Sequence, residues 1–251
     1  MRTLKITLAY DGSEFSGWQV QPGRPTIQGT LAEALRRITG ESVLPQGSGR
    51  TDAGVHALAQ VASCTMETSI PDSNLVIALN DILPATIRVM QVEEVKPEFH
   101  ARRSARAKTY RYRVFRGDIC PPFLARQVYH HPYPLDEQAM MAAAPAVVGE
   151  HDFTSFAAVD PEKRDENGDR SNVRAISVSK WERAGEELVY TVRGNGFLHH
   201  MVRNLVGTFL LVGKRSLQAG DVVRILQARD RSANPGATAP AGGLYLVSVE
   251  Y

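Results

Sequence analysis

The chain has 251 residues, of which 43% are hydrophobic and 22% charged, and its formal net charge is only +2. This is the composition of a globular protein with one large core or two of ordinary size, and it excludes a fibrous or low-complexity chain. Two cysteines, Cys64 and Cys120, exclude a disulfide framework and lack the spacing of a zinc site. The opening residues lack the apolar region of a signal peptide, and the longest apolar stretch, residues 205–213, is too short to cross a bilayer. We therefore expect a protein of the reducing cytoplasm.

The first half of the chain alternates between the periodicities of strands and helices. Apolar residues recur at helical spacing over 27–38, Thr26 is a residue type that caps helices, and Gly40 is one that ends them. The elements predicted here are a strand over 4–10, that helix, a short strand from Val43, a strand over 57–66, a helix capped by Asp72 or Ser73, and a strand over 86–95. Their order is βαββαβ. The glycine- and aromatic-rich segment 10–19 is predicted to be a loop, and its residue types alone indicate no chemistry.

The second half has the same order of elements without a repeat of sequence. The elements predicted here are a strand over 108–115, a helix from Asp136, a hairpin over 172–197, a buried helix over 198–213, a helix over 221–229 and a strand over 243–251. Two such orders predict an α+β fold of two ferredoxin-like units, with mainly antiparallel sheets and a cleft between the units. The predicted domains are residues 1–104 and 105–251. We expect the acidic segment 160–169 to be a solvated loop.

Residues 100–116 hold seven lysines and arginines and no acidic residue. Among them, Tyr110 and Tyr112 alternate with Arg111 and Arg113, so a strand here would carry rings on one face and guanidinium groups on the other. Such a strand can be a solvated edge whose arginines deter aggregation. Aromatic rings beside cations are also what RNA recognition uses, through base stacking and phosphate contacts. The pattern leaves both interpretations open.

The segment GSGRTDAGVHALAQ, residues 47–60, places Arg50 and Asp52 in a glycine-rich loop between two predicted strands. Asp52 can simply accept a backbone hydrogen bond that closes the turn. A loop on a rigid sheet is also where proteins present reactive groups, and an arginine nearby favours the ionised, nucleophilic form of a carboxylate. The second interpretation makes Asp52 the candidate catalytic residue.

The apolar helix predicted over 198–213 contains Arg203. A buried arginine needs an anionic partner, which here is either a structural acid or Asp52. His199 and His200 would lie about 100° apart on a helix, so we expect them to pack or to contact RNA, and we expect no metal site. Residues 207–215 resemble a phosphate loop only superficially, because the spacing is one residue too long and no Ser or Thr follows the lysine. We therefore expect no nucleotide hydrolysis and no nucleotide cofactor.

Six segments, in order along the chain, resemble the tRNA pseudouridine synthases of the TruA type. They are AYDGSEFSGWQVQ, GRTDAGVHALAQV, FHARRSARAKTYRYRV, VVGEHDFTSF, GNGFLHHMVRN and AGGLYLVSVEY. The second of these resembles the catalytic motif of the family, and together the six extend over nearly the whole chain. The acidic segment 160–169 departs from the family pattern.

This resemblance implies isomerisation of uridine to pseudouridine at positions 38 to 40 of the tRNA anticodon stem-loop, by a homodimer without cofactor, in the cleft between the two units. It implies that Asp52 is the nucleophile and that Tyr110 packs against the target base. It also implies that Arg203 pairs with the aspartate and that Leu244 lines the base pocket. Arg50 is a further candidate substrate-binding residue.

Two other functions are to be weighed against this one. A non-catalytic RNA-binding module would need no fixed carboxylate, and it would leave the uridines of a tRNA unchanged. A hydrolase of the glycosidase kind needs two acids across the scissile bond, whereas the sequence around Asp52 offers only one. Release of free uracil would favour the hydrolase.

We predict that tRNA binding depends strongly on salt and is carried largely by residues 100–116. Each neutralised phosphate steepens the fall of log affinity with log salt by about 0.9 on a duplex and about 0.7 on a single strand. Charge reversal at Arg102 and Arg106 should therefore flatten this slope, as measured in a binding titration at several salt concentrations. An unchanged slope would identify the segment as a solvated edge.

Overall fold

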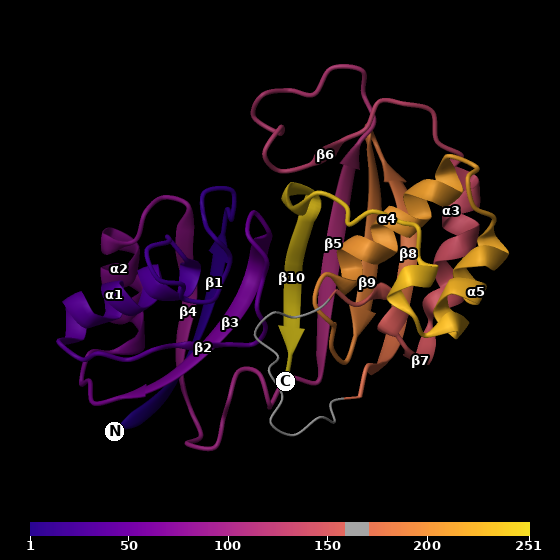
Figure 1. The fold of residues 1–251 in the computed structure, drawn as a ribbon. Helices are drawn as coiled ribbons and strands as arrows, with labels where there is room; N and C mark the ends of the chain where they lie inside the picture. Colours follow the sequence, from indigo (N-terminus) through magenta and orange to yellow (C-terminus); the bar gives the residue numbers. More distant parts are fainter. Residues whose placement is uncertain (159–170) are drawn as a thin grey trace. The chain divides into compact units, whose positions relative to one another are not determined.

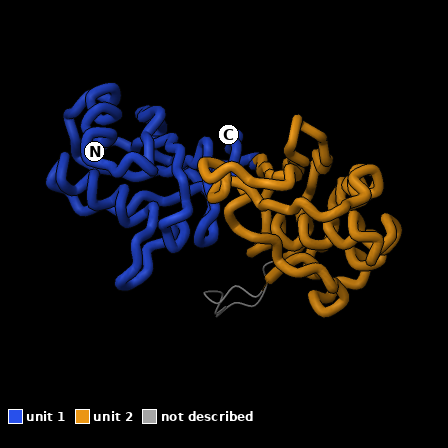
Figure 2. The backbone as a smooth tube through the Cα atoms, turned by 90° about the horizontal axis from the view of Figure 1, so that it is seen from above, with its two compact units in different colours: residues 1–108, 245–251 blue, residues 109–244 orange. Residues whose placement is uncertain are grey.

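The structure, a computed structural model, describes residues 1–158 and 171–251 (Figure 1). The predicted acidic loop 160–169 lies outside these residues. The chain forms two compact units, which we call unit 1 (residues 1–108 and 245–251) and unit 2 (residues 109–244; Figure 2). Within the described ranges, no helix is both long and apolar enough to cross a membrane.

Unit 1 is a sheet with two helices. Its elements are β1 (Arg2–Tyr10), α1 (Ile27–Thr39), β2 (Gln46–Gly47), β3 (His56–Met66), α2 (Asp72–Ile82), β4 (Ile87–Val95) and β10 (Leu244–Glu250). The strands lie in the order β4-β1-β3-β10, and β2 pairs with β3. Strand β1 is antiparallel to β3 and β4, whereas β10 is parallel to β3.

The core of unit 1 follows from the alternation and the helical spacing of its apolar residues. Every second residue of β1 from Leu4 to Tyr10 is buried, because successive side chains of a strand point to opposite faces. On α1, Ile27, Leu31 and Leu35 form one buried stripe at a spacing of four residues. The side chain of Thr26 caps α1 and the helix ends before Gly40, which confirms both of those predictions.

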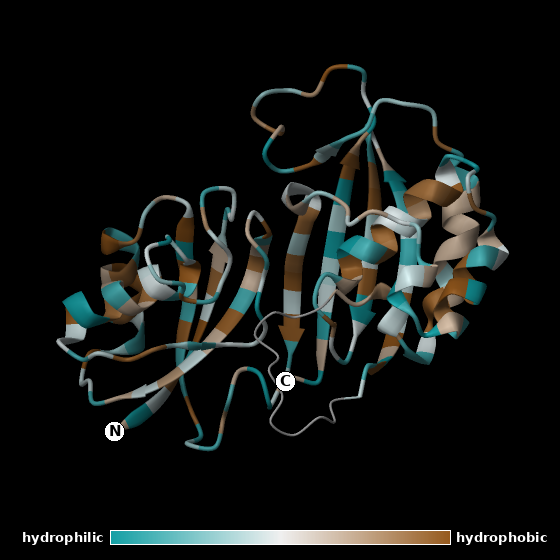
Figure 3. Cartoon of the chain, viewed as in Figure 1, coloured by the Kyte–Doolittle hydropathy of each residue, from teal (hydrophilic) through white to brown (hydrophobic). Residues whose placement is uncertain are grey.

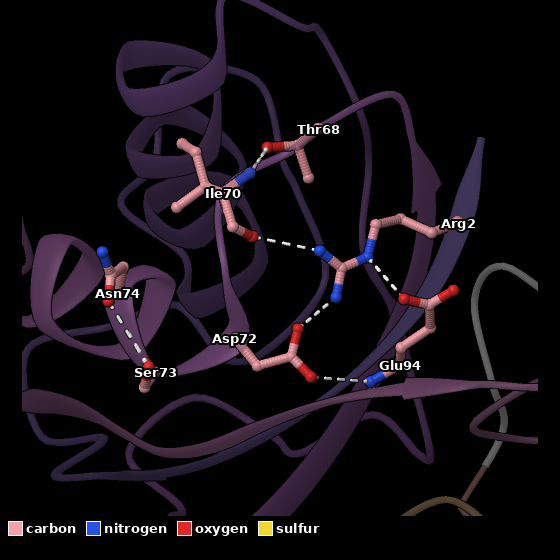
Figure 4. Close-up of polar contacts among 7 residues, drawn as sticks. All are labelled: Arg2, Thr68, Ile70, Asp72, Ser73, Asn74 and Glu94. Carbon is pink, nitrogen blue, oxygen red and sulfur yellow. Dashed lines mark hydrogen bonds and ion pairs between the residues drawn. The ribbon is translucent and has the colours of Figure 1, made fainter.

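Helix α2 begins differently from the prediction. The residue at its N-cap is Pro71, so the prediction of Asp72 or Ser73 as the cap is wrong. Asp72 instead pairs with Arg2 of β1 and accepts a hydrogen bond of 3.1 Å from the backbone N–H of Glu94 (Figure 4). Arg2 also pairs with the carboxylate of Glu94 at 3.0 Å, so one charged cluster ties β1, α2 and β4 together.

Unit 2 contains paired strands and three α-helices. Its elements are β5 (Ala107–Phe115), β6 (Tyr129–His130), α3 (Glu137–Ala143), β7 (Gly149–Asp152), β8 (Val173–Ala184), β9 (Glu187–Gly194), α4 (Met201–Gly213) and α5 (Ala219–Ala228). Short 3-10 helices cover Ala144–Val147, Thr154–Phe156, Arg231–Ala233 and Ala241–Gly243. The strands lie in the order β5-β9-β8-β7, and β6 pairs with β5.

The core of unit 2 lies between its strands and α4. The rings of Trp181 and Tyr190, on β8 and β9, have centroids 5.0 Å apart, and Phe209 of α4 lies 5.3 Å from Tyr190. Nearly all of α4 is buried, as its sequence predicts. Figure 3 shows the apolar residues, in brown, recurring along the strands of both units.

The predicted α+β class with mainly antiparallel sheets is confirmed, and unit 1 has the predicted βαββαβ order through β4. The last strand, β10, pairs with β3 from the first half of the chain, with Tyr245 opposite His56 and Leu246 opposite Ala57. Backbone hydrogen bonds between segments far apart in the chain decide this pairing, and residue types do not indicate it. The domain boundary at residue 104 stays a prediction.

Candidate active site

Asp52 lies half-buried in the loop between β2 and β3, two residues after the exposed Arg50. The turn after Asp52 is closed by its own main chain, because the N–H of Val55 donates to the backbone carbonyl of Asp52 at 3.1 Å. This closing bond does not need the Asp52 carboxylate. The main chain alone therefore supplies one hydrogen bond that closes this turn.

The loop 10–19, for which the sequence alone indicated no chemistry, packs directly against the Asp52 loop. The N–H of Trp18 donates to the carbonyl of Thr51 at 3.0 Å, and the N–H of Gly54 donates to the carbonyl of Phe15 at 3.3 Å. The hydroxyl groups of Tyr10 and Thr51 share a buried hydrogen bond of 2.8 Å. The residues on both sides of Asp52 are thus held by the first loop of the chain.

Two glycines allow this close approach of the backbones. A Cβ atom on Gly12 would lie 2.0 Å from the carbonyl oxygen of Val55, which is well inside contact distance. Gly17 has a φ of +90°, and a Cβ atom there would lie 2.6 Å from the carbonyl oxygen of Thr51. Both positions therefore require glycine, one for space and the other for space and conformation.

A buried polar network holds the start of the same loop. The side chain of Gln60, on β3, is fully buried; its amide oxygen accepts from the Ser48 hydroxyl at 2.6 Å, and its amide nitrogen donates to the Gly49 carbonyl at 3.0 Å. The ammonium group of Lys108 donates to the Ser48 carbonyl at 2.6 Å. Burial raises the pKa of Tyr10, which borders this network, to about 12, so its hydroxyl stays neutral and able to hydrogen-bond. These bonds fix the backbone that leads to Arg50 and Asp52.

His56, for which the sequence pattern indicated no role, anchors the other side of the loop. The ring is buried and stacks on Tyr245 with centroids 4.7 Å apart. Its Nδ1 accepts from the N–H of Gly12 at 3.2 Å and lies 3.2 Å from the carboxylate of Asp11. The sequence feature that could have indicated a role for His56 is its position directly after the DAG turn, at the start of a predicted strand.

Tyr110 and Arg203 belong to unit 2. Tyr110, on β5, is buried, and its ring meets Phe197 at a centroid distance of 5.0 Å in an edge-to-face arrangement. Arg203, on α4, is half-buried and donates from Nε to the carbonyl of Ala239 at 2.7 Å. Leu244 is buried at the first position of β10.

The basic segment 100–116 does not form the predicted face of two stacking rings. Tyr112 is fully buried and donates to the carbonyl of Pro240 at 2.8 Å, so its ring belongs to the core. Arg113 is also engaged internally, in a two-pronged ion pair with Glu187. The cations that remain exposed in the segment are Arg102, Arg103, Arg106 and Arg111.

The prediction for the two adjacent histidines rested on a wrong assumption. Helix α4 begins at Met201, and His200 lies before it with a left-handed backbone (φ 56°). Without helical geometry the two rings are not splayed apart, and the centroids of His199 and His200 are 3.9 Å from each other. Helix geometry therefore does not exclude a shared ligand for this pair.

Comparison with known proteins gives the site its chemical context. The model of a family described as tRNA pseudouridine synthase matches residues 6–102 and 143–251. The chain is 53% identical over 251 residues to a tRNA pseudouridine synthase A of Solibacter usitatus, with all of both chains covered. It is 46% identical over 254 residues to one of Moorella thermoacetica, again over all of both chains. A chain of the solved Cbf5-Nop10-Gar1 complex matches 82% of this chain and 54% of its own length, with 14% identity and a TM-score of 0.30.

The family match defines the class of protein first: this is a pseudouridine synthase, and pseudouridine synthases are isomerases. Because two relatives are 53% and 46% identical to it over their full length, the chain belongs to the tRNA pseudouridine synthase A family. The matched residues include the loop that carries Asp52 and both glycines that support it.

We predict that Gly12→Ala lowers pseudouridine formation by about 100-fold, the effect expected when a reactive group moves by about 1 Å. The added Cβ atom would collide with the Val55 carbonyl and push the Asp52 loop away from loop 10–19. Single-turnover rates on tRNA would measure the loss, with circular dichroism as the check of folding. Gly220→Ala is the matched control, because nothing lies within 4 Å of its added Cβ atom. A folded Gly12→Ala enzyme with a normal rate would contradict the supporting role of this loop.

Proposed function

We propose that the enzyme converts uridine to pseudouridine at positions 38 to 40 in the anticodon stem-loop of tRNAs, with Asp52 as its nucleophile. We also propose that the enzyme acts as a homodimer in the cytoplasm, without cofactor or metal. The observation that supports Asp52 is its setting: a half-buried carboxylate on a loop whose backbone is held from two sides by hydrogen bonds. Such rigidity is what a positioned nucleophile needs.

The proposed chemistry breaks the N1–C1′ bond of uridine, turns the base and joins C1′ to C5. One proton leaves C5 and one is gained at N1, so no atoms are added or removed overall. A carboxylate can carry the reaction by attacking the sugar or the base and leaving again at the end. This balance requires no redox group and no phosphate donor.

The other site residues take supporting roles in this proposal. The target uridine must leave its stack before it can react, and the ring of Tyr110 would receive the extruded base. Arg50 and Arg203 would supply positive charge to the phosphates or to the nucleophile. Leu244 would form an apolar wall of the base pocket. The exposed arginines Arg102, Arg103 and Arg106 would contact the tRNA backbone, which positions the substrate without reading its sequence.

We predict that Asp52→Asn lowers pseudouridine formation by roughly three or more orders of magnitude, as when an essential catalytic group is removed from another enzyme. The amide keeps the size of the side chain but loses the negative charge and the nucleophilicity. Tritium release from tRNA labelled at C5, under single-turnover conditions, would measure the rate. Asp81→Asn is the matched control, because Asp81 is an exposed carboxylate on α2 of the same unit.

Folding and tRNA affinity of Asp52→Asn should persist, since the phosphate contacts are expected on the basic segment. A folded variant with near-normal turnover would contradict the mechanism. If the wild-type enzyme released free uracil, the hydrolase would be the better function. Binding of tRNA without any conversion would favour the RNA-binding module.

We predict that Arg203→Lys lowers the single-turnover rate at saturating tRNA more than it lowers tRNA affinity. Lysine keeps the charge but loses the planar group of several donors, one of which holds the Ala239 carbonyl. Arg224→Lys on α5, with an exposed side chain, is the control. If affinity collapses while the rate on bound tRNA stays normal, Arg203 contacts RNA and does not support Asp52.

A further inference from the structure

Unit 1 has a groove of about 440 Å³ at the opposite end of β3 from the Asp52 loop. Its floor is the paired ends of three strands, where Gln46 of β2 lies opposite Ser63 and Thr3 of β1 lies opposite Thr65. Ser63 lies seven positions after His56 along β3, which corresponds to about 23 Å of strand. A ligand of the groove would therefore lie far from the candidate nucleophile.

The rim of the groove is the turn 97–103, which is fixed to the sheet at Ala101. The backbone N–H of Ala101 donates to the Ser63 hydroxyl at 3.0 Å, and its carbonyl accepts from the Tyr251 hydroxyl at 2.9 Å. The ring of Phe99, which lines the groove, packs on Tyr251 with centroids 4.9 Å apart. The turn is thus already ordered before any ligand binds, which lowers the entropic cost of binding.

The charges around the groove favour an anionic group of a ligand at the rim and a neutral group inside. At the rim, Arg102 and Arg103 are exposed, and within the described residues neither forms an ion pair. In the wall lies Glu98, and the pKa of Cys64, which also lines the groove, is raised first by burial and then by the negative charge of Glu41. These carboxylates disfavour a phosphate inside the groove, whereas the arginines favour one at its rim.

The polar groups of the groove suit a heterocycle. Backbone N–H groups of the turn donate to Nδ1 of His100, so the neutral ring carries its proton on Nε2 and can donate there. On the floor, the hydroxyls of Thr3 and Thr65 share a hydrogen bond of 3.1 Å and that of Ser63 accepts from Ala101, so a ligand beside Phe99 would use the remaining lone pairs of these hydroxyls. A neutral base that stacks on a ring while its phosphate meets an arginine is the usual way in which proteins bind single-stranded nucleic acid.

We propose that this groove binds one unpaired nucleotide of the tRNA, remote from the target uridine, with its base against Phe99 and its phosphate at Arg103. The proposal rests on the proposed function in so far as the RNA is the tRNA substrate. It gives the enzyme a second contact on the same RNA, which adds affinity without taking part in the reaction.

The test is the binding of fluorescein-labelled hexacytidylate, which contains no uridine, to the full-length protein by fluorescence anisotropy. Phe99→Leu keeps apolar packing on Tyr251 but removes the stack, and it should weaken binding by about fivefold or more. Arg103→Glu should weaken binding and flatten its salt dependence. Phe99→Tyr should bind like the wild type, as should the control Arg37→Glu, which reverses an exposed charge on α1.

If Arg103→Glu loses binding and Phe99→Leu does not, the protein attracts only the phosphates of the oligonucleotide. That result would overturn the proposal that the groove binds a base. No binding of hexacytidylate by the wild type would overturn it as well. The proposed function is tested separately, by measuring pseudouridine formation in tRNA. If the enzyme is active but Phe99→Leu binds the oligonucleotide normally, only the groove proposal is contradicted. If the enzyme is inactive but Phe99→Leu weakens binding, only the proposed function is contradicted.

Discussion

The close approach of the Gly12 backbone to Val55 is the contact on which the candidate site of unit 1 depends. No side chain fits between these two backbones, because even a methyl group on Gly12 would lie 2.0 Å from the Val55 carbonyl oxygen. Loop 10–19 therefore acts as a rigid support for the turn that presents Asp52. The hydrogen bonds of Trp18 and Gly54, and the hydroxyl pair of Tyr10 and Thr51, form only because the two loops are this close.

The support on the other side is polar although it is buried. Gln60 uses both atoms of its amide on the segment before Arg50, and a buried amide without partners would be destabilising. A satisfied polar network specifies one arrangement more sharply than apolar packing does, because each donor must find its acceptor. This explains why a loop rich in glycine, which is flexible as an isolated segment, has a single arrangement in the fold.

The basic segment shows how partners decide what a charge can do. Arg113 and Arg116 of unit 2 are paired with Glu187 and Glu137, so they stabilise the fold. Arg102 and Arg103 of unit 1 sit on an anchored turn and remain exposed, which leaves them available to an anionic ligand. One run of cations in the sequence is therefore divided into two roles by the fold.

Much of this was decided by the sequence itself. Alternation along β1, the stripe of α1 with its Thr26 cap, and the α+β order are local properties, set by side-chain periodicity and backbone preference, and they were predicted. So was Asp52 as the candidate nucleophile, from its glycine-rich loop. Only the tertiary structure decided the rest: the burial of Tyr112, the start of α4 after His200, the pairing of β10 with β3, and the roles of Gly12, Gln60 and His56. Each of these depends on which distant segment lies opposite, and residue types along the chain do not encode that contact in a form that local patterns reveal.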